Sequence, residues 1–355
     1  MKENKISWFI GLVLLALMFV GLYALEKALP PSTMLFTILK KGVIYALIAV
    51  SMNLLNGFTG LFSLGQAGFM VIGAYTYAIL TIPVNMRAMI YQYYDGGVVQ
   101  FALPAIVGLL CAGLVAAFFA FLVGLPVLRL KSDYLAIATL GFAEIIRAFI
   151  QYEGLGPLTN GSNLLRRFPS FTGILYPFAA VAICVAVIVL LIHSTYGRAL
   201  KAIRDDETAA EAMGINLFFH KQFSFVTSSF FAGIGGALLA MYQGSIQAAT
   251  FKSAMTYEIL LIVVIGGMGS ITGSIIASFL FVASSEWWLR FLDNEMFIGA
   301  FKMPLLRSGF RMVVFSVIIM AVVLLYRRGI MGDKEFNLRR ITQHLTGKKG
   351  VRHDG

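Results

Sequence analysis

Apolar runs of about 20 residues recur along the chain, and they constrain its fold more than any other feature. Each run is long enough to cross roughly 30 Å of hydrocarbon as a helix. A soluble fold could not bury so many such runs, and only 13% of the 355 residues are charged, about half the share of a soluble domain. The sequence therefore predicts an all-α, polytopic integral membrane protein.

The apolar runs predict about ten transmembrane segments. The first run is longer than the apolar part of a usual signal peptide and no clear cleavage motif follows it, so we expect it to be retained. The predicted segments are residues 6–25, 34–55, 58–80, 101–127, 134–151, 174–193, 223–243, 256–267, 270–291 and 309–326. We accordingly expect an N-terminal segment with its linker (1–33), a transmembrane domain (34–326) and a basic tail (327–355).

The basic residues indicate which loops face the cytoplasm, because cytoplasmic loops carry an excess of lysine and arginine. Such residues gather near residue 130, between residues 198 and 221, and in the tail. Ten spans with a cytoplasmic N-terminus place all three regions and both termini in the cytoplasm. The same bias accounts for the net charge of +11, so we expect no nucleic-acid partner. Lys40 and Lys41 fit this scheme less well.

Two glycine-rich stretches interrupt the predicted spans: NGFTGLFSLGQAG (Asn56–Gly68) and IGGMGSITGS (Ile265–Ser274). Glycine costs about 1 kcal/mol in a helix interior relative to alanine. Each stretch follows a run that enters from the outer side and precedes a run that returns. One explanation is a discontinuous element whose backbone groups face a cavity. The other is close helix packing through small residues. Both remain open.

In the cavity interpretation, the two stretches form a translocation path between halves related by an internal, parallel repeat. The polar groups available there are not ionisable, which suits a small and overall neutral substrate. The candidate residues of this path are Asn56, Gly57, Gly60, Ser63, Gly65, Gln66, Gly266, Gly267, Gly269 and Gly273.

Glu144 and Arg147 form a candidate intramembrane charge pair, since residues three apart share one helix face. Ionisable groups at membrane depth are candidates for function, but such a pair can also neutralise itself and serve only packing. No phosphate-binding loop, metal-ligand spacing or catalytic constellation is visible. We therefore expect no enzyme, no metal site and no bound cofactor, with any ATP used by partner subunits.

The stretch STYGRALKAIRDDETAAEAMGIN (194–216) places mixed charges and many alanines between two long apolar runs. We predict one short cytoplasmic helix over about 197–214, which stops at Gly214. Its alanines would let another protein approach closely. A helix that lies on anionic lipid would be richer in lysine, so the composition favours a contact with protein. The alternative is an ordinary connector.

Five ordered stretches resemble a known family: GFTGLFSLGQAGFMVIGAY (57–75), DYLAIATLGFAEIIR (133–147), YGRALKAIRDDETAAEAMGIN (196–216), FAGIGGALLA (231–240) and GGMGSITGS (266–274). They resemble the permeases of branched-chain amino acid ABC importers, LivM type. The resemblance covers about residues 40–326. The Ala209-Ala210-x-x-x-Gly214 spacing resembles the EAA coupling motif, although Thr208 stands where glutamate is usual.

The resemblance implies the permease subunit of an ATP-driven importer for leucine, isoleucine and valine. It implies alternating access in the cytoplasmic (inner) membrane of a prokaryote. Urea, short amides or other amino acids are alternative substrates, and a stand-alone channel or secondary transporter is the runner-up. The implied partners are a homologous LivH-type permease, two ABC ATPase subunits, an extracytoplasmic substrate-binding protein and membrane lipid. The implied ATPase-coupling residues are Arg198, Arg204, Glu207, Ala209, Ala210, Glu211 and Gly214.

Overall fold

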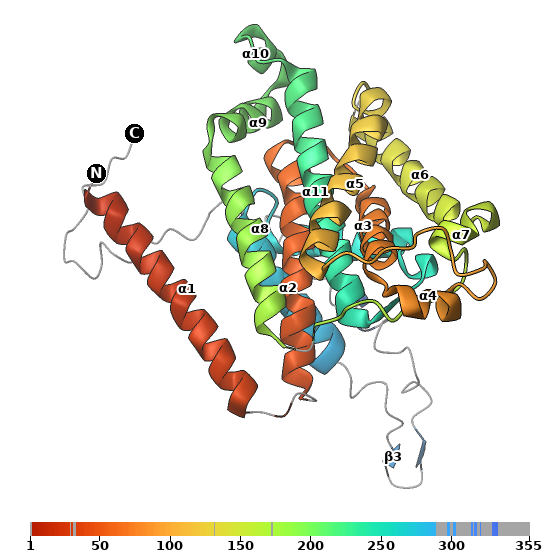
Figure 1. Ribbon diagram of the computed structural model, residues 1–355. Coiled ribbons are helices and arrows are strands. Elements are labelled where there is room, and N and C mark those ends of the chain that lie inside the picture. The colour runs from red at the N-terminus through yellow and green to blue at the C-terminus, as the bar shows by residue number, and fades with distance from the viewer. Residues whose placement is uncertain are drawn as a thin grey trace.

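The computed structural model describes residues 2–28, 30, 33–130, 132–171, 173–288, 297–298, 301–302, 314, 316–317, 320 and 329–332. This part of the chain is almost entirely helical (Figure 1). The predicted all-α membrane fold is confirmed. Nearly all of the predicted span at 309–326, and the tail apart from residues 329–332, lie outside the described residues.

The first half of the chain is a series of helices joined by short connections. In chain order they are α1 (Lys2–Ala28), α2 (Met34–Asn53), a π-helix (Leu54–Phe58), α3 (Gln66–Thr81), α4 (Val84–Ile90), α5 (Ala105–Val127), α6 (Ser132–Gln151), a 3₁₀ turn (Glu153–Leu155) and α7 (Gly156–Thr159). The predicted segment 58–80 is wrong at its start, because helix α3 begins only at Gln66. The glycines that precede Gln66 weaken a helix there.

The second half continues with α8 (Leu175–His193), α9 (Thr195–Asp205), α10 (Glu207–Ala212), α11 (Leu217–Gln243), a 3₁₀ turn (Ala248–Thr250), α12 (Ser253–Gly266), α13 (Ile271–Ala283) and a π-helix (Ser284–Trp288). Four two-residue strands form two antiparallel pairs. Strand β1 (Leu165–Arg166) pairs with β2 (Ser245–Ile246), and β3 (Phe297–Ile298) pairs with β4 (Phe301–Lys302).

Five helical segments among the described residues are long and apolar enough to cross a membrane. They are Met34–Phe58, Ala105–Val127, Tyr134–Gln151, Leu175–His193 and Leu217–Gln243, and a sixth span results if α3 and α4, bent by 120°, count as one. Helices α12 and α13 have 14 and 13 residues, or about 20 Å each at 1.5 Å per residue. The predicted segment 256–267 is thus shorter than a full span, because α12 ends at the glycine-rich break. The predicted segment 270–291 is helical from Ile271 to Trp288, since α13 runs directly into the π-helix Ser284–Trp288.

Helices α2 and α11 form the centre of the bundle. In their most apolar windows 67% and 78% of the residues are buried within the chain, against 22% in α6 and 33% in α8. Small residues bring α11 against α3. A Cβ atom on Gly73 would lie 2.1 Å from the Gly233 carbonyl oxygen, and one on Gly236 would lie 2.1 Å from the Met70 carbonyl oxygen. Close backbone approach of this kind is how membrane helices associate.

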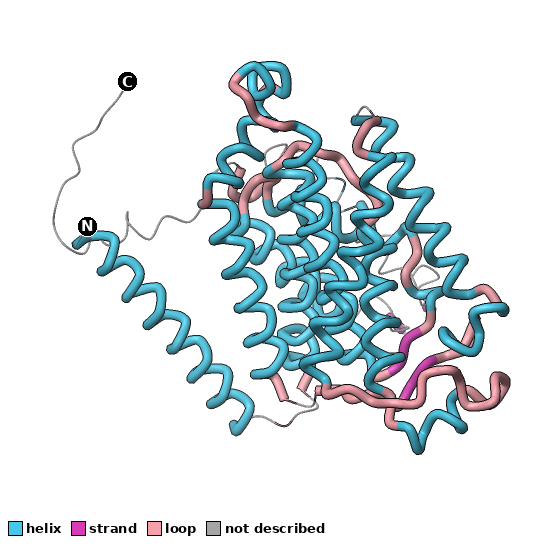
Figure 2. Tube along the Cα trace, turned by 45° about the horizontal axis from the view of Figure 1, so that its top comes forward, coloured by secondary structure: helices cyan, strands magenta, loops and turns pink. Residues whose placement is uncertain are grey.

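The two ends of the bundle differ. Helices α9 and α10 stand at one end (Figure 1). The β1–β2 strand pair lies at the other end, as Figure 2 shows. Helix α11 connects the two ends, since it begins beside α10 and its last residue, Gln243, comes just before strand β2.

Candidate functional site

The predicted single helix at 197–214 is wrong in one respect, because it consists of two helices. Helix α9 ends at Asp205, and α10 begins at Glu207. Asp206 between them has an extended backbone, and its carboxylate accepts hydrogen bonds from the backbone N–H groups of Thr208 (2.8 Å) and Ala209 (3.0 Å). An aspartate that caps a new helix in this way must leave the preceding helix.

Helix α10 exposes most of its surface. Glu207, Ala209 and Glu211 are exposed, and the side chain of Met213 just beyond the helix is 83% exposed. Ala210 is the exception, because it is buried against its own chain. Of the four candidate coupling residues on α10, Ala210 alone is covered by its own chain. Gly214 is exposed, with a φ of +83°, and ends the element as expected.

An ion pair and a cation–π contact help to hold the α9–α10 element on the bundle. Lys221 of α11 forms an ion pair of 2.6 Å with Glu207. The ammonium group of Lys201 lies over the ring of Phe58, 5.6 Å from its centroid. Arg198 is exposed on α9. The element is thus anchored from beneath, while its outer surface stays open.

The first glycine-broken stretch continues α2 as a π-helix and then runs irregularly to Gln66. Its polar side chains are buried. Asn56 accepts a hydrogen bond from the Ser63 backbone N–H (3.2 Å), and the Gln66 side-chain amide donates to the Ser51 hydroxyl (2.7 Å). Gly65 lies close to α6, where a Cβ atom would be 3.2 Å from the Thr139 carbonyl oxygen.

The second glycine-broken stretch lies directly against the first. The amide of Asn53 donates to the Ser270 carbonyl (2.9 Å) and the Ser274 hydroxyl (2.8 Å), and its oxygen accepts from the Gly269 N–H (2.8 Å). Cβ atoms on Gly57 and Gly266 would lie 2.4 Å from the Gly269 nitrogen and 2.6 Å from the Gly273 carbonyl carbon. Gly267 ends α12. These glycines are therefore in close backbone packing.

Arg204 of α9 contacts both glycine-broken stretches. Its guanidinium donates a hydrogen bond of 3.2 Å to the Gly57 carbonyl. A Cβ atom on Gly60 would lie 2.9 Å from Arg204 Cγ, and one on Gly269 would lie 3.2 Å from Arg204 Nη1. Both breaks thus occur at the α9 end of the bundle, so the two elements enter from the same side. The sequence suggested the two stretches and the α9 element separately, without their contact.

The predicted charge pair forms and extends to a third residue. Arg147 Nε donates to Glu144 Oε2 at 2.8 Å, and Glu144 Oε1 accepts from the backbone N–H (3.3 Å) and the hydroxyl of Ser253. Ser253 is the first residue of α12. The pair therefore ties α6 to the start of α12, a packing role that the sequence left open.

Two further charged residues, Glu258 and Glu286, were missed, and one of them is the partner of Lys41. Lys41 forms an ion pair of 2.5 Å with Glu286, 245 residues away, which explains the lysine that the loop scheme could not place. Glu258 lies in the second turn of α12. The sequence could have identified it, because it is a glutamate inside the apolar run MTYEILLIVVIG. Among the residues that the structure describes, no cluster of three or more histidine, cysteine, aspartate or glutamate side chains could hold a metal ion.

Comparisons with known proteins agree with this architecture. Residues 34–326 match the family described as "Branched-chain amino acid transport system / permease component". The permease proteins LivM of Salmonella typhimurium and Escherichia coli are each 34% identical over 288 residues, which is 72% of this chain and 63% of theirs. LivH of Escherichia coli is 23% identical over 83% of this chain and 93% of its own length.

The matched region is somewhat less than two thirds of the length of these LivM relatives. No solved structure matches the chain. The resemblance inferred from the five sequence motifs is confirmed by a family match that covers most of the chain. The chain therefore belongs to the family of branched-chain amino acid transport system permease components.

Proposed function

We propose that this chain is the transmembrane permease subunit of an ATP-driven importer for leucine, isoleucine and valine. The observation that carries this proposal is the α9–α10 element, exposed outward and joined inward through Arg204 to both glycine-broken stretches. A stand-alone channel has no need of such an element. The names of the similar proteins, which are branched-chain amino acid permeases, support the substrate class.

The element would transmit movement as follows. An ATPase subunit binds the exposed surface formed by Ala209, Glu211 and Met213. When the ATPases close on ATP, this surface moves, and Arg204 carries the movement to the ends of α2 and α12. ATP shifts the equilibrium between outward-facing and inward-facing states because the ATPases bind the two states with different affinity. The permease chain supplies the lever and no ATP chemistry of its own.

The remaining partners follow from the same proposal. The second permease is a LivH-type homologue, and an extracytoplasmic binding protein delivers the substrate on the side opposite α10. The chain lies in the inner membrane, with α9, α10 and both termini in the cytoplasm. Urea and short amides are the alternative substrates, and they carry no net charge that would demand a charged site.

The test is ATP-driven uptake of radiolabelled leucine into vesicles that contain the chain with its copurified partners. We expect Met213→Glu to lower uptake and leucine-stimulated ATP hydrolysis at least tenfold, because a charge would enter a desolvated contact. Met89→Glu is the matched control, since Met89 is 63% exposed on α4 at the other end of the bundle. Equal activity of the two variants, or purification of this chain as an active homo-oligomer, would refute the coupling role.

A further inference from the structure

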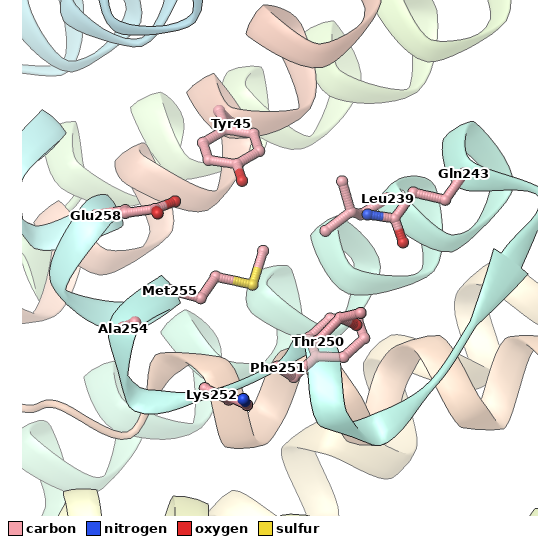
Figure 3. A pocket seen from close by; sticks show the side chains of 9 residues that line it. All are labelled: Tyr45, Leu239, Gln243, Thr250, Phe251, Lys252, Ala254, Met255 and Glu258. Carbon is pink, nitrogen blue, oxygen red and sulfur yellow. The ribbon is translucent and has the colours of Figure 1, made fainter. Parts of the chain in front are cut away.

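A cavity of about 200 Å³ lies between α2, the end of α11 and the start of α12 (Figure 3). The buried side chains of Tyr45, Leu239 and Phe251 line it from different sides, together with the half-buried Met255. Figure 3 shows the Tyr45 hydroxyl directed into the space between these elements. The volume is below the roughly 300–1,000 Å³ of sites for drug-sized ligands, so the occupant is a smaller molecule.

Two side chains of opposite charge line this cavity together with the apolar groups. Lys252 immediately precedes α12, and Glu258 lies six residues later. Both side chains are exposed in this chain, and neither forms an ion pair within the described residues. Lys41 on the adjacent α2 is already paired with Glu286. Glu258 belongs to the apolar helix α12, and ionisable residues within such segments mark substrate pathways.

One small ligand can reach both charged side chains, because both line the same cavity. A rise of 1.5 Å per residue separates the Cα atoms of Ser253, the first residue of α12, and Glu258 by about 7.5 Å along the helix axis, and Lys252 immediately precedes Ser253. The flexible four-carbon stem of a lysine shortens the gap between the charged ends. A ligand that carries a cation and an anion close together, and an apolar remainder, matches the two charges and the apolar side chains of the lining.

We propose that this cavity binds an α-amino acid zwitterion with an apolar side chain. Lys252 binds its carboxylate and Glu258 binds its ammonium group, while Leu239, Phe251 and Met255 contact the side chain. The proposal rests on the proposed function and deepens it, because it places the substrate in the permease. Urea and short amides carry no full positive or negative charge and have no branched apolar group. They therefore match neither the two charged residues nor the apolar side chains of the cavity.

The position of the cavity fits the direction of import. Helix α11 begins at Leu217 beside α10, and its last residue, Gln243, lines the cavity. These residues are separated by about 39 Å along the helix. Helix α2 joins Tyr45 of the cavity to Asn53, just before the first break, and α12 joins Glu258 to the second break. Movement at Arg204 therefore reaches the cavity through two helices.

Thiol labelling tests the cavity directly. Ala254 lines it and is exposed, so we would introduce Ala254→Cys after replacing the native thiols by Cys111→Ser and Cys184→Ala. In the purified complex with its partners, leucine should slow maleimide labelling of the introduced thiol at least fivefold. Leucinamide and 4-methylpentanoate each lack one charge and should protect at least tenfold more weakly. Equal protection by all three compounds, or none by leucine, would overturn the proposal.

Charge-neutralising variants separate ligand recognition from structural support. Glu258→Gln should abolish the preference for leucine over 4-methylpentanoate, and Lys252→Gln should abolish the preference for leucine over leucinamide. A residue with a purely structural role would change protection by all ligands alike. Glu153→Gln and Arg166→Gln are the matched controls, since both residues are exposed and neither lines the cavity. Unchanged selectivity in Glu258→Gln would refute its assignment.

Parallel uptake measurements distinguish failure of this proposal from failure of the proposed function. Leucine uptake by the Ala254→Cys complex without protection of its introduced thiol would reject the cavity and leave the importer standing. Absence of leucine, isoleucine and valine uptake by the unmodified complex would reject the importer for these substrates. In that case, protection by methionine or phenylalanine would uphold the zwitterion site, and protection by urea or acetamide instead would reject it.

Discussion

The contact between Gly60 and Arg204 gives the sharpest test of how α9 is connected to the membrane helices. Gly60 has a φ of +76°, and a Cβ atom there would lie 2.9 Å from Arg204 Cγ. A side chain in the left-handed region costs roughly 1–2 kcal/mol. Overpacking against Arg204 adds about 1–3 kcal/mol. Gly60→Ala should therefore disfavour the observed seating of α9 by about 2–5 kcal/mol in total.

Gly244→Ala isolates the backbone part of this effect. Gly244 also has a positive φ, +68°, but a Cβ atom there would meet no atom within 4 Å. It ends α11 at the far end of the bundle. We expect this control to lower the free energy of unfolding by about 1–2 kcal/mol only. The difference between the two variants then measures the contact with Arg204.

The assay combines unfolding in a denaturing-detergent titration with leucine uptake per folded complex. The contact with Arg204 adds about 1–3 kcal/mol to the cost of Gly60→Ala. Since 1.4 kcal/mol changes an equilibrium constant tenfold, this excess lowers the population of the observed α9 position by a factor of roughly 5–150. We expect the loss to appear as less leucine uptake per ATP hydrolysed. Gly244→Ala should keep normal coupling. Adding Arg204→Ala to Gly60→Ala should return much of the contact energy, as a double-mutant cycle measures. Identical stability and coupling in the two glycine variants would refute the reasoning.

Two other contacts lead to independent predictions. Asp206→Ala removes the cap of α10 and should destabilise that helix by about 1 kcal/mol. The amide protons of residues 207–212 should then exchange with solvent roughly five times faster. Unchanged exchange would show that the cap is dispensable. Lys41→Met leaves the half-buried Glu286 carboxylate without its partner and should lower the free energy of unfolding by about 1–3 kcal/mol. The double variant Lys41→Met/Glu286→Leu should be more stable than Lys41→Met, because no uncompensated charge remains, and a double variant no more stable than the single one would contradict this explanation.

The membrane class, the order of the helices and the two breaks followed from the sequence alone. Hydropathy over 20 residues depends only on neighbours along the chain, so runs such as 105–127 and 175–193 identify spans directly. The glycines of residues 56–68 and 265–274 marked the breaks for the same reason. The five motifs also identified the family. Asp206 was a local signal too, since an aspartate favours a cap, but a single continuous helix was expected there.

The tertiary structure decided which groups meet. Arg204 lies 147 residues from Gly57, and Lys41 lies 245 residues from Glu286. The cavity takes its residues from α2, α11 and α12. Such pairs depend on how far each helix slides and rotates against its neighbours, and that register is fixed by close packing, as between Gly73 and Gly233. Hydropathy and local capping leave the register undetermined, because helices of the same composition can pack at several depths. The sequence by itself therefore determined which segments could cross the membrane. Only the packing of the helices determined that α2 and α12 connect the cavity with the glycine-broken stretches that Arg204 of α9 contacts.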